Sequence, residues 1–407
     1  MSPEPLTPYQ RRLFGFLTVA SFFEGYDFIA LTQILPNFRA EMGMGKAGAG
    51  ILLMVVNLGS VLSYFLVRSA DRWGRRVVLT VTIAGYTVAT FLSGLAPNPW
   101  VFAIFQLNAR VFLIGEYATS MVIAAEEYPA SRRGTIMGLI AAFSSLGAIV
   151  CAGTVPVLIR TPWGWRTVYF VALIPLVIVG YARRGLRETR RFEEQGHPEE
   201  ARGLMEIWKT PYRRRVLELA AVWCCAYIAT QNTVAFWKDF AVSERGLTDA
   251  DVGRAIATAA VVAMPLVFLV GKLMDVLGRR PVAAVVFVVG AAGTWGCYTL
   301  EGQGPLTAAL VLGIFASSAY LPILNALTAE LFPTEHRADG FAWSNNLLGR
   351  IGYVLSPALV GFLAARIGWG PVLRSCGLFS LLAVVLVYAL LPETKGRTLE
   401  ETSRVVP

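Results

Sequence analysis

Long apolar stretches alternate with short polar segments along this chain of 407 residues. A helix needs about 20 residues to cross the hydrocarbon core of a bilayer, which is roughly 30 Å thick. Stretches with room for such a helix occur twelve times, near residues 13–38, 48–67, 77–96, 100–125, 135–159, 166–185, 214–237, 250–272, 281–300, 305–329, 340–365 and 370–391. The pattern therefore predicts an all-α membrane protein with twelve transmembrane helices.

A short polar motif is repeated halfway along the chain. The residues DRWGRR at 71–76 recur as DVLGRR at 275–280, a displacement of 204 positions. The same displacement relates further identical residues, namely Glu126 and Glu330, Pro129 and Pro333, Arg133 and Arg337, and Gly164-Trp165 and Gly368-Trp369. Identical residues related by one displacement at this many sites indicate a fused tandem repeat. We expect two pseudo-symmetric six-helix bundles, at 1–185 and 213–391, with a linker at 186–212 and a tail at 392–407.

The overall composition supports a lipid environment. The chain is 55% hydrophobic and 15% charged, with a mean hydropathy of +0.56, which is more apolar surface than a soluble domain can bury. If both termini are cytoplasmic, the inner loops and tails hold 25 of the 36 Lys and Arg residues and the outer loops hold 8, while Arg110, Arg350 and Arg374 lie within spans. Basic residues gather on the cytoplasmic side. We therefore expect a multi-pass protein of the inner (plasma) membrane with a cytoplasmic linker and tail, and nothing favours nucleic-acid binding.

Patterns typical of enzymes and metalloproteins are not evident. The five cysteines fall within predicted spans, and His197 and His336 lie in inner loops with no second histidine or thiol nearby. These positions favour neither a disulfide framework nor a metal site. No nucleophile and base pair or phosphate-binding loop is apparent, so we expect no cofactor and no enzyme activity. The expected partners are a small-molecule substrate, protons and the lipid bilayer, with the chain acting as a monomer.

Twelve spans in two halves, with a D-x-x-G-R-R turn after spans 2 and 8, resemble the major facilitator superfamily. The resemblance covers essentially the whole chain and implies a transporter that works by alternating access between two bundles. Three further motifs are similar to those of the aromatic-acid and organic-acid proton symporters: Glu24-Gly25-Tyr26-Asp27, Arg110 with Gly115-Glu116, and Gly349-Arg350-Ile351-Gly352.

Two features bear on a sugar-porter alternative. The residues Pro392-Glu393-Thr394-Lys395-Gly396 resemble the tail signature of sugar porters, which many relatives outside that group also carry. Span 7, in contrast, carries Gln231-Asn232 and lacks the double-Gln signature of sugar porters.

The first D-x-x-G-R-R turn departs from the superfamily pattern, because Val67 stands where Gly is usual, whereas the second copy keeps Gly271.

Charged residues inside the spans are few and favour a proton pathway. A carboxylate or guanidinium at the bilayer centre costs about 2.5–3.5 kcal/mol, so it persists only beside a partner or a cavity. Glu24 and Asp27 are spaced i, i+3 on one helix face, where repulsion and burial disfavour two charges. We expect at least one of them to accept and release a proton, with Arg110 and Glu116 as coupling partners. The alternative is that Glu24 forms only a structural pair with Arg110.

Arg350 in span 11 is the candidate anion site. A guanidinium offers a planar fork that matches a carboxylate. Asn345 and Asn346 precede it, the latter one helical turn away. We expect Arg350 to anchor an organic anion, and an internal salt bridge is the alternative.

Span 7 supplies further candidates for substrate contact. Gln231 stands 204 positions after Asp27, so the second copy of span 1 carries an amide where the first carries an acid. Its neighbour Asn232 is a second amide candidate, and a structural hydrogen bond between helices is the alternative for Gln231. The aromatic residues Tyr320 and Tyr353 lie on spans expected to line a cavity, where their rings can stack on a substrate.

The two D-x-x-G-R-R turns are candidate gates. The resemblance implies that Asp71 and Asp275 meet the positive end of a helix from the other half. Gly74 and Gly278 allow a tight turn between spans. The charged partners expected at the gates are Arg75, Arg76, Arg279 and Arg280, with the acids Glu126 and Glu330. Simple anchoring of basic residues on the cytoplasmic side is the alternative.

These residues and the resemblance together predict a proton-coupled symporter of a small organic anion, with an aromatic or other carboxylate metabolite favoured and import expected. A sugar or polyol porter is one alternative. A transporter-like sensor that binds its ligand without translocating it is another.

Overall fold

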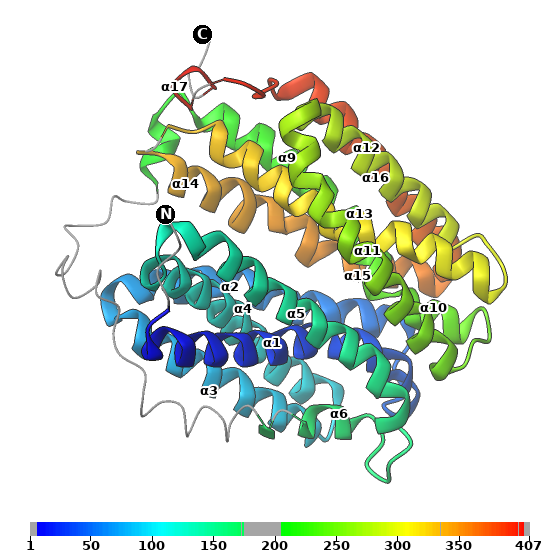
Figure 1. The fold of residues 1–407 in the computed structure, drawn as a ribbon. Helices are drawn as coiled ribbons and strands as arrows, with labels where there is room; N and C mark the ends of the chain where they lie inside the picture. Colours follow the sequence, from blue (N-terminus) through cyan, green and yellow to red (C-terminus); the bar gives the residue numbers. More distant parts are fainter. Residues whose placement is uncertain (1–5, 172, 175–204, 334, 398, 403–407) are drawn as a thin grey trace. The chain divides into compact units, whose positions relative to one another are not determined.

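The computed structural model describes residues 6–171, 173–174, 205–333, 335–397 and 399–402, and every regular element in these ranges is a helix (Figure 1). The elements are α1 (Pro8–Glu41), α2 (Lys46–Trp73), α3 (Arg75–Gly94), α4 (Pro99–Glu127), α5 (Ala130–Leu158), α6 (Arg166–Phe170), η2 (Glu206–Lys209), α9 (Arg213–Ala235), α10 (Trp237–Ser243), α11 (Asp249–Leu277), α12 (Arg279–Cys297), α13 (Gln303–Glu330), α14 (Arg337–Phe341), η3 (Ala342–Gly349), α15 (Arg350–Ile367), α16 (Trp369–Leu390) and α17 (Leu399–Thr402).

The helices agree with the apolar pattern of the sequence. Among the described residues, ten helices are long and apolar enough to cross a membrane, and α9 with α10 makes an eleventh that bends by 40°. Each matches one predicted span. The remaining predicted span, 166–185, begins as α6 and then passes outside the described residues. The fold is thus the all-α, multi-pass architecture that the sequence predicts.

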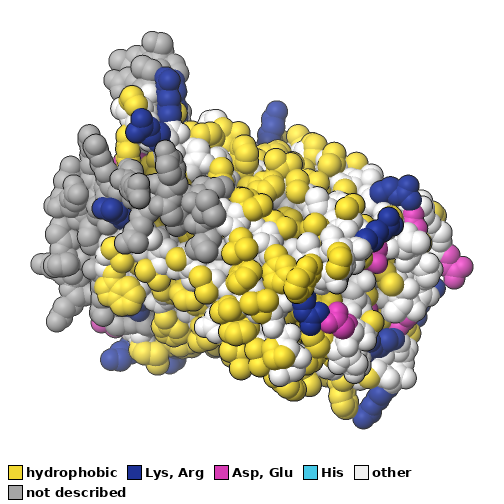
Figure 2. Space-filling model, turned by 90° about the horizontal axis from the view of Figure 1, so that it is seen from below, with side chains coloured by type: hydrophobic (Ala, Val, Ile, Leu, Met, Phe, Trp, Pro, Cys, Tyr) yellow, Lys and Arg dark blue, Asp and Glu magenta, His cyan; other side chains and the backbone are white. Residues whose placement is uncertain are grey.

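Large apolar side chains cover the outward faces of these helices. Phe65, Ile104, Phe268 and Val385 are each more than half exposed. Figure 2 shows such side chains across the middle of one face, with Lys, Arg, Asp and Glu gathered toward its ends. Exposing this much apolar surface to water is unfavourable, at about 25 cal/mol per Å². The surface is suited to the hydrocarbon core of a bilayer.

Internal contacts divide the chain into two units. Unit 1 consists of Met1–Phe38 and Val55–Ala201, and unit 2 of Arg39–Met54 and Arg202–Pro407. The apolar core of unit 1 lies between α1, α3, α4 and α5 and includes Leu17, Ile83, Leu113 and Ile140. Each of these helices therefore presents one apolar face to the inside of its unit.

In unit 1, two glycines let α1 and α5 touch, and Figure 1 shows these helices side by side. A Cβ atom on Gly25 would lie 1.8 Å from the carbonyl oxygen of Ser144, and one on Gly147 would lie 1.8 Å from that of Phe22. No side chain fits at either position without moving a backbone. The close approach brings Glu24, next to Gly25, against α5.

In unit 2, α9 packs in the same manner against the chain around Arg350. A Cβ atom on Gly349 would lie 2.7 Å from the Cβ of Trp223, and one on Gly352 would lie 2.5 Å from the carbonyl oxygen of Cys224. The two glycines flank Arg350 and bring α9 onto the start of α15. This contact determines which α9 side chains reach the arginine.

A cluster of charges joins the segment 39–54 to other parts of unit 2. Arg39 forms an ion pair with Asp239, whose side chain is 1% exposed, and Lys46 Nζ lies 2.5 Å from Glu244 Oε1. Glu244 also accepts a hydrogen bond of 2.7 Å from the backbone N–H of Trp369, the first residue of α16. Glu244 thereby satisfies a backbone donor that a helix N-terminus leaves free.

Candidate functional site

Three buried carboxyl groups lie on α1 and α4 of unit 1. Glu24 and Asp27 are each 7% exposed, and Glu116 is fully buried. The Ser144 hydroxyl donates a hydrogen bond of 2.6 Å to Glu24 Oε2, and the Ser120 hydroxyl donates one of 2.8 Å to Glu116 Oε1. Glu24 and Glu116 are therefore held by neutral hydroxyl donors, which leaves both carboxyl groups able to exist with or without a proton.

Arg110 is the buried cation of this region. Its guanidinium donates a hydrogen bond of 3.3 Å to the carbonyl oxygen of Phe28 and lies 4.5 Å above the centre of the Phe28 ring. The charge of Arg110 acts on Glu24 and Asp27 through space. The direct pair with Glu24 that the sequence left open is not formed. A single guanidinium thus acts on two of the three buried carboxyl groups, and within the described part of the chain it forms an ion pair with neither.

The chain before Arg350 winds as a π-helix. The segment η3, Ala342–Gly349, closes its turns with i→i+5 hydrogen bonds and leads directly into α15. In an α-helix, residues five apart point about 140° away from each other. In a π-helix they share a face, so Asn345 joins Asn346 on the side of Arg350. The sequence identified Asn346 as the neighbour one turn away and could not predict the wider turn.

Tyr227 of α9 connects these groups. Its hydroxyl donates a hydrogen bond of 2.7 Å to Asn345 Oδ1 and accepts one from the guanidinium of Arg350. The sequence analysis did not identify Tyr227, because the contact joins residues 118 positions apart. Arg350 is half-buried and Asn345 is buried. The result is a polar group of one cation, one hydroxyl and one amide at the α9–α15 contact.

Aromatic rings surround this polar group. Tyr227 stacks on Trp223 with ring centres 5.5 Å apart, and it forms T-shaped contacts with Tyr353 and Tyr320, whose ring centres lie 5.3 Å and 6.2 Å away. The charge of Arg350 acts on the hydroxyl groups of both Tyr227 and Tyr320. Both aromatic residues expected from the sequence, Tyr320 and Tyr353, are therefore in the group. Trp223 is a second member that the sequence did not reveal.

The other amide candidates are placed differently. Asn232 Nδ2 donates to the Ser356 hydroxyl at 2.7 Å and to the Ile228 carbonyl at 2.8 Å. Its amide nitrogen thus holds α9 against α15. Gln231 and Asn346 are half-buried.

The two D-x-x-G-R-R turns have matching ion pairs. Arg75 Nη2 lies 3.3 Å from Glu126 Oε1 in unit 1, and Arg279 Nη2 lies 2.8 Å from Glu330 Oε1 in unit 2. Each pair joins the helix after the turn to the helix that follows it. The displacement of 204 positions in the sequence thus corresponds to a repeated contact within each unit.

The remaining gate candidates vary in their surroundings. Gly74 and Gly278 adopt φ values of 90° and 108°, which only glycine adopts readily. The side chain of Asp275 is 76% exposed and lies 3.5 Å from Arg279 Nη1. Arg280 lies over the Tyr388 ring. Arg76 is exposed, and the side chain of Asp71 lies outside the described residues.

The tail signature closes the second turn. Glu393 accepts hydrogen bonds of 2.9 Å from the backbone N–H groups of Arg279 and Arg280, the first residues of α12, and further bonds from Thr394 and Lys395. Burial raises the pKa of Glu393, but these hydrogen bonds outweigh it and hold the pKa below its usual value. The acid that caps the start of α12 is therefore Glu393. The tail motif thus has a structural role within unit 2.

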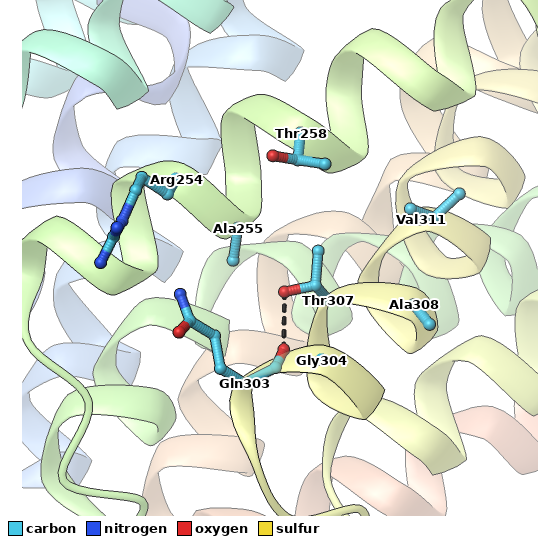
Figure 3. A pocket seen from close by; sticks show the side chains of 8 residues that line it. All are labelled: Arg254, Ala255, Thr258, Gln303, Gly304, Thr307, Ala308 and Val311. Carbon is cyan, nitrogen blue, oxygen red and sulfur yellow. Dashed lines mark hydrogen bonds between the residues drawn. The ribbon is translucent and has the colours of Figure 1, made fainter.

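A groove on unit 2 lies apart from these groups. It has a volume of about 480 Å³ and runs between α11 and α13 (Figure 3). Its lining consists of Arg254, Ala255, Thr258, Gln303, Gly304, Thr307, Ala308 and Val311. None of the predicted site residues borders it. Among the described residues, no group of three or more His, Cys, Asp or Glu side chains is placed to hold a metal ion.

Comparisons with known proteins match the whole length of the chain. The model of the Major Facilitator Superfamily matches residues 17–347 and 219–405. A putative niacin/nicotinamide transporter of Bacillus subtilis is 24% identical, over 96% of this chain and 98% of the relative. A gentisate transporter of Corynebacterium glutamicum is 26% identical, over 84% of this chain and 79% of its own length.

A similar fold occurs among solved structures. The crystal structure of a bacterial homologue of the human lysosomal transporter Spinster, in an inward-facing and occupied conformation, superposes with a TM-score of 0.78. It shares 14% sequence identity, and the match covers 94% of this chain and 97% of that one. At this identity the likeness concerns the fold alone.

Proposed function

Because the chain belongs to the Major Facilitator Superfamily and is a membrane transporter rather than an enzyme, we propose that it is a proton-coupled symporter of a small organic anion. The observation that carries this proposal is the half-buried Arg350, held by the Tyr227 hydroxyl and surrounded by aromatic rings. A guanidinium binds a carboxylate through two parallel hydrogen bonds. The cargo is an aromatic or other carboxylate metabolite.

Two lines of support favour an aromatic carboxylate. The charge of Arg350 acts on Tyr227 and Tyr320, and Tyr353 packs against Tyr227, so a planar ring attached to a bound carboxylate has aromatic surface to pack on. The names of two relatives describe transport of niacin or nicotinamide and of gentisate. Niacin and gentisate are aromatic acids.

Proton coupling is assigned to the acids of unit 1. Glu24, Asp27 and Glu116 are buried, and the only cation beside Glu24 and Asp27 among the described residues is Arg110. Three ionised carboxylates in a low-dielectric region would repel each other strongly. A proton that enters and leaves this group relieves the repulsion. Unit 1 then carries the proton and unit 2 the substrate.

The membrane arrangement follows the distribution of basic residues. We place the protein in the inner (plasma) membrane as a monomer, with both termini cytoplasmic, because 25 of the 36 Lys and Arg residues then lie on the cytoplasmic side. The D-x-x-G-R-R turns act as the inner gates in alternating access. The Arg75–Glu126 and Arg279–Glu330 pairs hold each turn in shape during that motion.

The anion assignment is tested by exchanging the guanidinium for an ammonium. Arg350→Lys keeps the charge and loses the fork, so the affinity of the purified protein for nicotinate, benzoate or gentisate should fall about tenfold, at about 1.4 kcal/mol per decade. Affinity for the matching neutral amide should change little. Arg374→Lys, in a half-buried position of α16, is the matched control. Equal losses for acid and amide would show that Arg350 is only a structural partner.

The alternatives predict different results. A sugar or polyol porter would bind xylose or a polyol in preference to every acid, and the tail signature no longer argues for it, because Glu393 has a structural role. A sensor would bind an acid but show no counterflow of labelled acid in proteoliposomes. Counterflow that a tenfold excess of xylose leaves unchanged would exclude both.

A further inference from the structure

The hydroxyl of Tyr227 is fixed in its hydrogen-bonding direction. A phenolic hydroxyl has one proton to donate, and Tyr227 donates it to Asn345 Oδ1 at 2.7 Å. Its oxygen is then free to accept, and it accepts from the guanidinium of Arg350. Because Asn345 receives the only proton, Tyr227 cannot act as a donor to a ligand while this contact persists. Tyr227 therefore acts on Arg350 rather than on a ligand.

The Tyr227 ring has little freedom to turn away. It stacks on Trp223 and forms T-shaped contacts with the rings of Tyr353 and Tyr320. Trp223 is itself held, because its indole N–H donates a hydrogen bond of 3.0 Å to the Thr328 hydroxyl. A ring packed in this way keeps its hydroxyl in one place.

The backbone also helps to place Asn345 and Arg350 next to Tyr227. Gly349 and Gly352 bring α9 into contact with the chain on both sides of Arg350. The π-helix η3 turns Asn345 onto the face that Arg350 occupies. The hydroxyl of Tyr227 thus connects two side chains that an α-helical register would point apart.

We propose that Tyr227 is a positioning residue for substrate binding: by holding one edge of the Arg350 guanidinium, it directs the remaining N–H groups toward a single carboxylate. This inference rests on the proposed function, because it assumes that Arg350 binds the anion. A guanidinium that is held in advance loses less freedom when the ligand binds. The site therefore distinguishes a carboxylate from its amide more sharply than a freely moving arginine does.

The test is a double-mutant cycle on ligand affinity. Benzoate, nicotinate, gentisate and succinate are each titrated against the purified full-length protein beside their neutral amides, and the acid that binds best is carried forward. Tyr227→Phe keeps the ring and removes the hydroxyl. We expect it to lower the affinity for that acid about fivefold to tenfold and the affinity for its amide less than twofold. The double variant Tyr227→Phe with Arg350→Lys should lose no more than Arg350→Lys alone.

Tyr298→Phe supplies the matched control. Tyr298 is another buried tyrosine of unit 2, and its hydroxyl donates a hydrogen bond of equal length, 2.7 Å, to the carbonyl oxygen of Thr233. It should leave the affinities for acid and amide unchanged. Thermal unfolding without ligand compares the two variants for folding, and a general loss of packing would weaken acid and amide binding alike.

The possible results separate the two proposals. If Tyr227→Phe and Arg350→Lys have additive effects, or if Tyr227→Phe behaves like Tyr298→Phe, Tyr227 does not position the arginine and the anion assignment still stands. If Arg350→Lys leaves acid binding unchanged, or if none of the four acids binds, the proposed function itself fails and the role of Tyr227 fails with it.

Discussion

The Ser144 hydroxyl on α5 donates a hydrogen bond of 2.6 Å to the Glu24 carboxyl group on α1. The bond exists because the glycine beside Glu24 lets the two helices touch. A hydroxyl stabilises a buried carboxyl group without adding the full charge of a lysine or arginine. In the proposed mechanism this allows Glu24 to change protonation state while it remains packed in unit 1.

The α1–α5 contact should be sensitive to a single methyl group. In Gly25→Ala the new Cβ would lie 1.8 Å from the Ser144 carbonyl oxygen, so one backbone must move. Overpacking of this kind costs about 1–3 kcal/mol or more, and the melting temperature in detergent should fall. Gly153→Ala on α5 meets nothing within 4 Å and is the control. It should melt at or slightly above the wild-type temperature, since Ala favours a helix. Equal melting of the two variants would contradict the close contact.

The Arg39–Asp239 pair should show a clear rescue by charge exchange. Both side chains are largely buried, so removing one partner leaves an uncompensated charge that costs about 3–5 kcal/mol. Arg39→Asp and Asp239→Arg should each lower the melting temperature, and the double variant should recover part of the loss. Arg214→Ala breaks an exposed i, i+4 pair with Glu218 and should cost only about 0.3–0.5 kcal/mol. No recovery in the double variant would show that the two residues do not depend on each other.

The Glu393 cap predicts a pH-dependent contribution to stability. Its pKa is held below the usual value, so the stabilisation is fully present above the pKa of the unfolded chain, about 4.3, and is lost as the pH falls through the lower folded-state value. Glu393→Gln should therefore lower the melting temperature at pH 7, and the difference from wild type should shrink below about pH 4. Glu301→Gln alters an exposed acid 3.7 Å from Arg245 and should show no such trend. A Glu393→Gln difference that stays constant from pH 7 to pH 4 would argue against the cap.

Much of the fold could be predicted from the sequence because lipid imposes a simple rule on it. A span must be long and apolar, and the eleven described spans all match predicted stretches. The two repeated turns could also be predicted from the sequence, because Gly74 and Gly278 adopt positive φ values that few other residues adopt. The bend after Ala235 was not predicted, because the predicted span 214–237 ends where α10 begins and α10 itself contains Lys238 and Asp239.

The candidate site was predictable in part, chiefly through its charged residues. A charged residue in an apolar span is conspicuous, so Glu24, Asp27 and Arg350 could be singled out. Tyr227 could not, because one tyrosine among 14 gains its role only from a contact with Asn345 across 118 positions. The π-helix also escaped prediction, since no residue in 342–349 distinguishes it from an α-helix.

The central claim, that protons accompany the anion through the buried acids of unit 1 and that Asp27 is required among them, is tested by following both in proteoliposomes that contain a pH-sensitive dye. Addition of the best-binding acid should produce a saturable proton influx in the wild type and in Asp27→Glu, beyond the passive influx in protein-free vesicles. Asp27→Asn keeps the shape of the side chain and loses the titratable group, so the influx should disappear while counterflow of labelled acid persists. Anion transport by the wild type without proton influx, or an undiminished influx in Asp27→Asn, would contradict the claim.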